Sequence, residues 1–409
     1  MIPVTFKIAV MAVLTVVWLY EMTLHFIQAR SVRNPIPENV KDVYDPETYA
    51  KWRRYHGEKN RLSLLTSTAS WLISMALMGL NVYAAFAGLF PKDSLWLQMF
   101  AVLLLATASD LLTIPFGYYD TMRIEEKYGF NRSTKKTFWI DQVKNFILSL
   151  LLITIVGSLL LGLHQWLGDL VIVAFTAAMV VFMLIMTFLS PFLFKIFNKF
   201  TPLEDGELKD GLTALLQKHG YKVRAIHVMD ASRRSTKSNA YFTGFGKMKT
   251  IVLYDTLVGS MTTEEICAVF AHELGHGLHK DTLKNVLLSS VQMLILAVLA
   301  WLTLRTEALY PPFGFDSVNY GFAIILIMSA EFALISPLYK MLTSAVSRKM
   351  EYRADAQAVS EGYGAALVSG LKKLGRENFS NLAPSPLLVK LEYDHPPLSE
   401  RIAAIEKKA

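Results

Sequence analysis

Long apolar runs separated by short polar segments dominate the chain of 409 residues. Each run is long enough to cross a bilayer as a helix, which takes about 17–25 residues. The first run lacks a small-x-small cleavage site, so a spanning helix is favoured over a signal peptide. We therefore predict seven membrane-spanning helices. They cover residues 2–24, 63–90, 95–118, 146–163, 170–194, 286–304 and 320–342.

Between the fifth and sixth runs the pattern becomes that of soluble structure. Residues 207–219 have the apolar spacing of an amphipathic helix. Three later segments alternate between apolar and polar positions, as strands do, and a Gly-Lys turn separates the last two. These segments are residues 221–228, 239–245 and 250–254. A small β-sheet is expected here, within a mainly α-helical protein.

This pattern divides the chain into four parts. Five spans with two polar loops come first, then a soluble catalytic region, then two further spans and a soluble C-terminal region. The predicted bounds are residues 1–194, 195–285, 286–346 and 347–409.

Charge supports this division and adds an orientation. Lysine and arginine are frequent in the loops after the odd-numbered spans and sparse after the even-numbered ones. By the positive-inside rule, the basic loops, the catalytic region and the C-terminus face the cytoplasm. Composition agrees, since 53% of residues are hydrophobic and only 18% are charged. The basic loops account for the net charge of +7, so nucleic acid is not an expected partner.

Two carboxylates, Asp110 and Glu331, fall inside predicted spans. Charged side chains are costly there and usually face a polar interior or a cavity. A role in lining an internal water-filled space and a role in helix packing both remain open.

The candidate chemistry lies in residues 271–276, Ala-His-Glu-Leu-Gly-His. On a helix, His272 and His276 share one face and can bind one zinc ion. Glu273 is placed to take a proton from a metal-activated water that attacks a carbonyl carbon. Thr262 and the glutamates after it suit a helix start, which favours this reading over an amphipathic helix with two incidental histidines. Peptide-bond hydrolysis is the predicted reaction.

Two histidines do not complete a zinc site. The segment 351–355, Glu-Tyr-Arg-Ala-Asp, places Glu351 and Asp355 one helical turn apart. One carboxylate can bind the metal while the other orients a ligating histidine. A solvated acidic helix face is the alternative.

Together these motifs resemble the CAAX prenyl protease type 1 family of membrane zinc metallopeptidases. The resemblance also includes His395-Pro396-Pro397 with Arg401, and it extends over nearly the whole chain. Further segments similar to the family are residues 126–131, 197–203 and 237–242.

The resemblance implies a gluzincin-like site. In it, Glu351 is the third zinc ligand, Asp355 lies behind the ligands, and His395 and Arg401 assist catalysis. It also implies that Asn239 and Ala240 lie on an edge strand that binds substrate backbone. Finally, it implies that the seven spans surround a large chamber in the membrane.

Family members cleave C-terminal CAAX sequences after a prenylated cysteine, which releases three residues. The short loop at residues 305–318 suits a bacterial member, so a bacterial inner-membrane location is expected. The partners would then be a peptide or protein substrate, with or without a lipid chain, and membrane lipid. Two alternatives are a quality-control protease of broad specificity and a catalytically silent receptor or channel.

Overall fold

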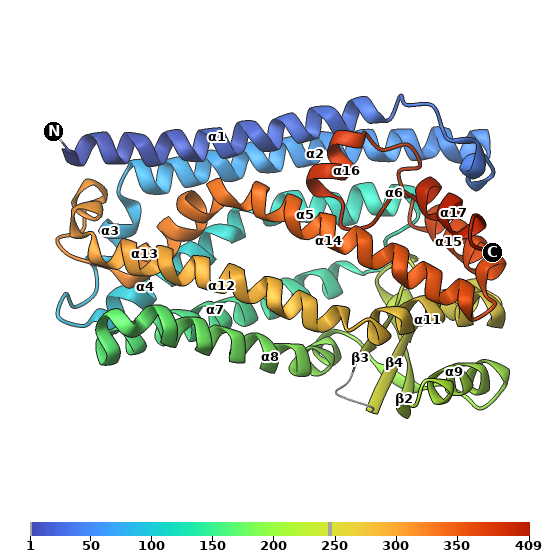
Figure 1. The fold of residues 1–409 in the computed structure, drawn as a ribbon. Coiled ribbons are helices and arrows are strands. Elements are labelled where there is room, and N and C mark those ends of the chain that lie inside the picture. Colours follow the sequence, from blue (N-terminus) through green and yellow to red (C-terminus); the bar gives the residue numbers. More distant parts are fainter. Residues whose placement is uncertain (1, 244–247) are drawn as a thin grey trace.

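Long helices lying side by side form most of the molecule (Figure 1). The computed structural model describes residues 2–243 and 248–409, so residues 244–245 of the predicted strand and its Gly-Lys turn lie outside the described residues. The helices of the apolar part are α1 (Ile2–Ser31), α2 (Pro46–Gly79), α3 (Val82–Ala87), α4 (Leu95–Ser109), α5 (Ile114–Tyr119), α6 (Glu126–Tyr128), α7 (Lys135–Leu167), α8 (Val171–Phe197), α12 (Asp281–Arg305), α13 (Tyr320–Leu326) and α14 (Phe332–Ser360).

Six helical segments of the described chain are long and apolar enough to cross a membrane, which confirms a multi-span architecture. They are Thr5–Ser31, Pro46–Gly79, Leu95–Tyr128, Lys135–Met186, Asp281–Arg305 and Tyr320–Ser360. The count is six rather than the predicted seven because one segment of 52 residues includes α7 and most of α8. These are separate helices packed against each other, and Gly168 between them has a φ of 54° that favours glycine.

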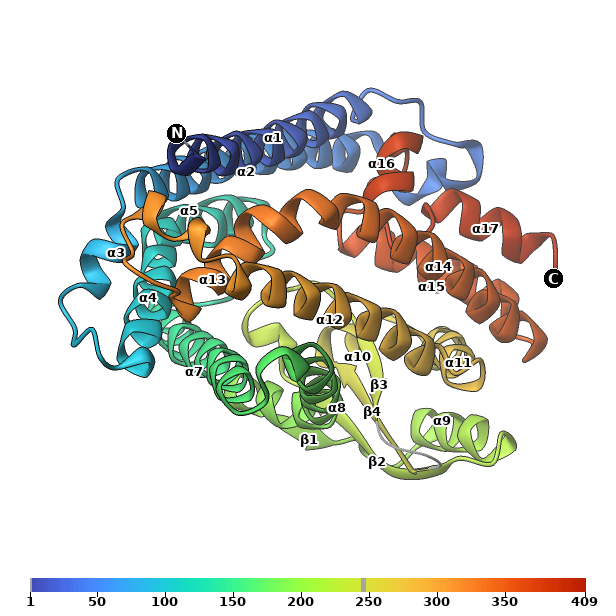
Figure 2. The ribbon, with the colours of Figure 1, turned by 60° about the vertical axis from the view of Figure 1, so that its left-hand side comes forward.

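The long helices follow one another in a closed order (Figure 2). Helix α1 packs on α2, and α2 packs on the short helical turns between α4 and α6. The order continues through α4, α7, α8, α12 and α14, and α14 returns to α1. Buried apolar side chains, such as Leu103, Leu161 and Phe322, form a hydrophobic core between the helices near α3 and α13.

Two helices run further than hydropathy alone predicts. Helix α2 begins at Pro46 within the polar segment before the second run, where the Asp45 side chain accepts the backbone N–H of Thr48. Helix α14 continues from the last span to Ser360. The predicted divisions after residues 194, 285 and 346 fall inside α8, α12 and α14. Hydropathy marks a change of environment, and a helix can cross it unbroken.

The polar part packs a four-stranded sheet against helices at one end of the long bundle (Figure 1). The strand order is β1-β2-β4-β3, with β2 and β4 parallel and β3 antiparallel to β4, so β3 is an edge strand. The strands are β1 (Phe200–Pro202), β2 (Lys222–Met229), β3 (Ala240–Thr243) and β4 (Met248–Tyr254). The helices are α9 (Glu207–Lys218), α10 (Asp255–Ser260), α11 (Thr263–Leu278), α15 (Gly364–Glu377), α16 (Pro386–Glu392) and α17 (Leu398–Glu406).

Candidate zinc active site

Helix α11 carries the His-Glu-Leu-Gly-His motif and is buried along most of its length. Its start is a capping box, in which Thr262 accepts the backbone N–H of Glu265 and Glu265 accepts that of Thr262. Gly275 of the motif lies against α14, where an added Cβ would meet the Ala354 Cα at 2.9 Å. The small residue therefore allows α11 to approach the helix that carries the candidate acidic ligand.

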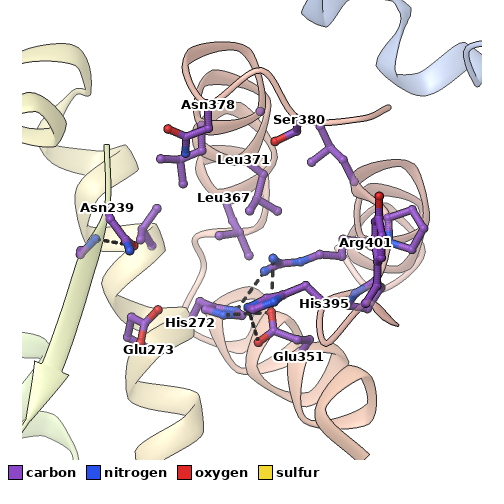
Figure 3. Close-up of a pocket in the computed structure, with 18 of the residues that line it drawn as sticks. Asn239, His272, Glu273, Glu351, Leu367, Leu371, Asn378, Ser380, His395 and Arg401 are labelled. Carbon is purple, nitrogen blue, oxygen red and sulfur yellow. Dashed lines mark hydrogen bonds and ion pairs between the residues drawn. The ribbon is translucent and has the colours of Figure 1, made fainter. Parts of the chain in front are cut away.

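His272, His276 and Glu351 converge from α11 and α14 (Figure 3). One ligand atom from each lies within 4.8 Å of the others. The Nε2 atoms of the two histidines are 3.3 Å apart, and Glu351 Oε1 lies 3.3 Å from His276 Nε2. This is a two-histidine, one-carboxylate set of the kind that holds catalytic zinc with a position left for water or substrate.

The Glu351 carboxylate supports this assignment independently. It is 4% exposed, and its Oε2 atom has no hydrogen-bond partner among the residues that the structure describes. Arg401 Nη1 lies 3.3 Å from this atom, but without hydrogen-bond geometry. Although burial raises the pKa of this carboxyl, the hydrogen bond from His276 and the nearby charges of His272 and Arg401 hold it well below its usual range. A buried, ionised oxygen without a hydrogen-bond donor fits a metal ligand.

Each of the two histidines also contacts a carboxylate through Nδ1, the ring nitrogen that faces away from the candidate metal position. His272 Nδ1 lies 2.8 Å from Asp355 Oδ1, and His276 Nδ1 lies 3.0 Å from Asp281 Oδ2. Such contacts fix the ring orientation and leave Nε2 of each histidine facing the site. Asp281 begins α12, just after Lys280, whose φ is 56°.

Asp281 was not predicted from the sequence, because its position beside His276 depends on the backbone turn at Lys280, which residue spacing does not show. An acidic residue a few positions after the second histidine is the one signal that the sequence offered. Lys284 and Arg353 both donate to its Oδ1, at 2.9 and 3.0 Å.

Arg401 and His395 complete the charged surroundings of Glu351. Arg401 is nearly buried and donates two hydrogen bonds to Asp355, of 2.9 and 2.6 Å. His395 is exposed, and its Nε2 lies 3.3 Å from Glu351 Oε1 while Nδ1 contacts Asp394 at 2.8 Å. Both predicted residues thus lie beside the ligand set. Arg401 is fixed by its hydrogen bonds to Asp355, and His395 faces the open side of the site.

These side chains line a cavity of about 630 Å³ together with the edge strand. Glu273 lies between His272 and β3, and Asn239 faces the cavity from the strand side (Figure 3). Opposite lie apolar side chains of α15, including Leu367 and Leu371, which were not predicted as site residues. Their amphipathic helical spacing was visible in the sequence, but nothing in it tied them to the motif.

Comparison with known proteins agrees with this geometry. Residues 25–199 match the family described as CAAX prenyl protease N-terminal, five membrane helices. Residues 202–409 match Peptidase family M48.

Two relatives match over most of their length. The chain is 31% identical over 423 residues to CAAX prenyl protease 1 homolog of Arabidopsis thaliana, which covers 98% of both chains. It is 32% identical over 408 residues to CAAX prenyl protease 1 of Saccharomyces cerevisiae, which covers 91% of this chain and 88% of that one.

A crystal structure of S. mikatae Ste24p is also similar, with a TM-score of 0.88 at 30% identity. The match covers 98% of this chain and 99% of that one. The resemblance seen in the motifs is therefore confirmed over both the membrane helices and the candidate zinc site. The chain belongs to the CAAX prenyl protease 1 family, which is a family of membrane-embedded M48 zinc metallopeptidases.

Proposed function

We propose that this protein cleaves a C-terminal tripeptide from protein substrates after a prenylated cysteine. One observation supports this most strongly: the candidate zinc ligands, Glu273 and a free β-strand edge all line one cavity. Curated relatives that match nearly the whole chain carry the name CAAX prenyl protease 1, which gives the substrate class.

The positions of the residues in the cavity suggest a separate role for each in peptide hydrolysis. Zinc, when bound by His272, His276 and Glu351, would polarise the scissile carbonyl and activate water. Glu273 lies beside the ligands and takes up the proton of the attacking water. His395 faces the open side of the cavity, where its ring N–H can donate to the developing oxyanion.

Arg401 acts mainly by holding other groups. Its paired hydrogen bonds keep Asp355 in place, and Asp355 in turn orients His272. Its Nη1 atom near Glu351 adds positive charge to the same region. We assign it a positioning role toward the ligands.

The edge strand holds the substrate backbone. The carbonyl of Asn239 accepts the N–H of Tyr254, so the N–H and C=O of Ala240 point away from β4 toward the free edge. An extended peptide can pair with this edge as an added strand. In the free protein the Ala240 N–H donates to the Asn239 side chain at 2.8 Å, and a substrate carbonyl would replace that contact.

The orientation and the interior are part of this proposal. Helices α7 and α8 count as two spans, which gives seven, and the closed order of the helices supports an internal chamber. The basic loops support a cytoplasmic location for the catalytic region and the C-terminus, by the positive-inside rule. The relatives from Arabidopsis thaliana and Saccharomyces cerevisiae are eukaryotic, so the bacterial location stays a prediction from the short loop at residues 305–318.

Peptide cleavage tests the proposal. Purified protein is mixed with a CAAX peptide in farnesylated and unmodified forms, and products are identified by mass spectrometry. Release of an intact tripeptide from the farnesylated form, absent with Glu273→Gln, supports the proposal. Equal cleavage of both forms at many positions would favour the broad quality-control protease instead. Absence of any cleavage by zinc-loaded protein would favour the silent receptor or channel.

A further inference from the structure

A second cavity, of about 550 Å³, lies where α7 begins and α8 ends. The side chains that line it include seven basic residues and a single acidic one, Asp141. The basic residues come from three separate segments of the chain, and within the described residues none of them lines the cavity of the candidate zinc site. They are Arg132, Lys136, Lys144, Lys195, Lys199, Arg233 and Arg234.

Most of this positive charge lacks a compensating carboxylate. Asp141 is engaged by Arg234, through contacts of 2.9 and 3.3 Å. Within the described chain, no ion pair to a carboxylate involves the side chains of four other lining residues: Arg132, Lys136, Lys199 and Arg233. Lys144 donates to the carbonyl of Ile196, at 2.7 Å, near the end of α8. Like charges gathered this closely repel one another, and an anion in the cavity would relieve that repulsion.

The cavity lies at the level where a membrane surface is expected. The candidate span of α7 begins at Lys135. One turn further on, Trp139 is 51% exposed, and Val143, Ile147 and Leu151 then continue an exposed apolar stripe at every fourth position. Tryptophan is typical of the headgroup layer, and such a stripe faces acyl chains. The basic cavity is therefore adjacent to a lipid-facing surface.

We propose that this cavity binds the phosphate-bearing headgroup of an anionic phospholipid. Lysine and arginine clusters beside a spanning helix are suited to such headgroups. The cavity volume is within the range of small-ligand sites. The neighbouring apolar stripe would hold the acyl chains, which a soluble phosphate compound lacks. This site goes beyond the proposed proteolysis and does not depend on it.

Lipid binding in neutral detergent tests the proposal. Native mass spectrometry measures the affinity of the full chain for phosphatidylserine and for phosphatidylcholine. Each basic residue beside an anionic headgroup is worth roughly fivefold in affinity. We expect Lys136→Gln/Lys199→Gln to weaken phosphatidylserine binding by about 25-fold and to leave phosphatidylcholine binding unchanged. Arg132→Gln/Arg233→Gln is a second pair from the same cavity and should act in the same way.

The control pair is Arg53→Gln/Lys135→Gln, which removes two exposed basic residues that do not line the cavity. It should keep the preference for phosphatidylserine. An equal loss in the control and cavity variants would overturn the proposal, because the charges would then act only as a diffuse cytoplasm-facing surface. Absence of any preference in the wild-type protein would overturn it as well.

Displacement of the lipid by millimolar glycerophosphoserine or inorganic phosphate would assign the cavity to a soluble phosphate compound instead. Unchanged unfolding temperatures of the variants exclude misfolding as the cause.

Discussion

Asp355 and Asp281 connect the candidate zinc ligands to charged residues further from the site. Asp355 holds His272 and is itself held by Arg401, while Asp281 holds His276 and receives Lys284 and Arg353. Each histidine is thereby limited to one ring orientation, with Nε2 toward the site. Residues on α11, α12, α14 and α17 thus contribute to one candidate ligand set.

Replacing Glu351 and Asp355 by alanine, one at a time, should distinguish the zinc ligand from the residue that orients His272. Glu351→Ala should remove most of the zinc, because it deletes a ligand. Asp355→Ala should weaken zinc binding by about 10- to 100-fold, because it deletes only the group that orients His272. Chelator competition measures both affinities. If Asp355→Ala lost the metal and Glu351→Ala retained it, the two assignments would have to be exchanged.

His395→Ala should leave zinc content unchanged and lower turnover by about 100- to 1000-fold, the usual effect of losing one oxyanion donor. Its imidazole is exposed, and His272 and His276 are oriented by Asp355 and Asp281 rather than by His395, so zinc binding should not depend on it. Steady-state kinetics with metal analysis on the same sample provides the check. A turnover number equal to that of the wild type would remove His395 from the mechanism.

At this scale the sequence was informative where spacing alone determines geometry. The spacing of four residues on one helix predicted that His272 and His276 share a metal-binding face. The acidic segment at residues 351–355 predicted the source of the third ligand. Asp281 could not be predicted in this way, because the left-handed turn at Lys280 brings it back toward His276. Helical spacing carries no information across such a turn.

At the level of elements, α11 depends on a buried charged residue at its start. Glu265 is 5% exposed and accepts hydrogen bonds from Thr262, Ser369 and Lys373. It therefore joins the capping box of α11 to α15, which forms the apolar side of the cavity.

Glu265→Gln should reduce the free energy of unfolding by about 1–3 kcal/mol, because charge-assisted hydrogen bonds are lost in a buried place. Burial alone would raise the pKa of Glu265, but the bonds from Lys373 and Ser369 lower it to about 2, from its usual 4.5. Its contribution is thus complete above about pH 4.5 and is lost as pH falls toward 2. Chemical unfolding in detergent should show the same difference in the free energy of unfolding between wild type and variant at about pH 8 and about pH 5. A gap that closed between these values would contradict the assignment, and Glu264→Gln, on the same turn, is the matched control.

The elements themselves were largely predictable, and their ends were not. Alternation predicted β2 and the pair β3–β4, while apolar length predicted the spans. Helix α14 continues from the last predicted span through the acidic segment at residues 351–355, because residues 343–346 remain helical although they are less apolar. Pairing between strands needs the folded chain, and so the edge position of β3 rested on the family resemblance.

For the whole molecule, orientation in the membrane is the feature most open to test. Cysteines replacing Lys92 and Lys135, one at a time in a Cys267→Ala background, should be labelled from opposite sides of intact vesicles. Lys92 lies in the turn before α4, and Lys135 begins α7. Cys267 is the one native cysteine and is buried, so it can be removed without a surface change. Labelling of both positions from the same side would contradict the seven-span arrangement.

We propose that His272, His276 and Glu351 hold a zinc ion that is required for cleavage of prenylated substrates. Tripeptide release from a farnesylated CAAX peptide by the purified protein tests this directly when zinc content is determined on the same samples. We predict that full removal of zinc by a chelator abolishes release and that stoichiometric zinc restores it. Tripeptide release at the wild-type rate by protein shown to contain no zinc would contradict the claim.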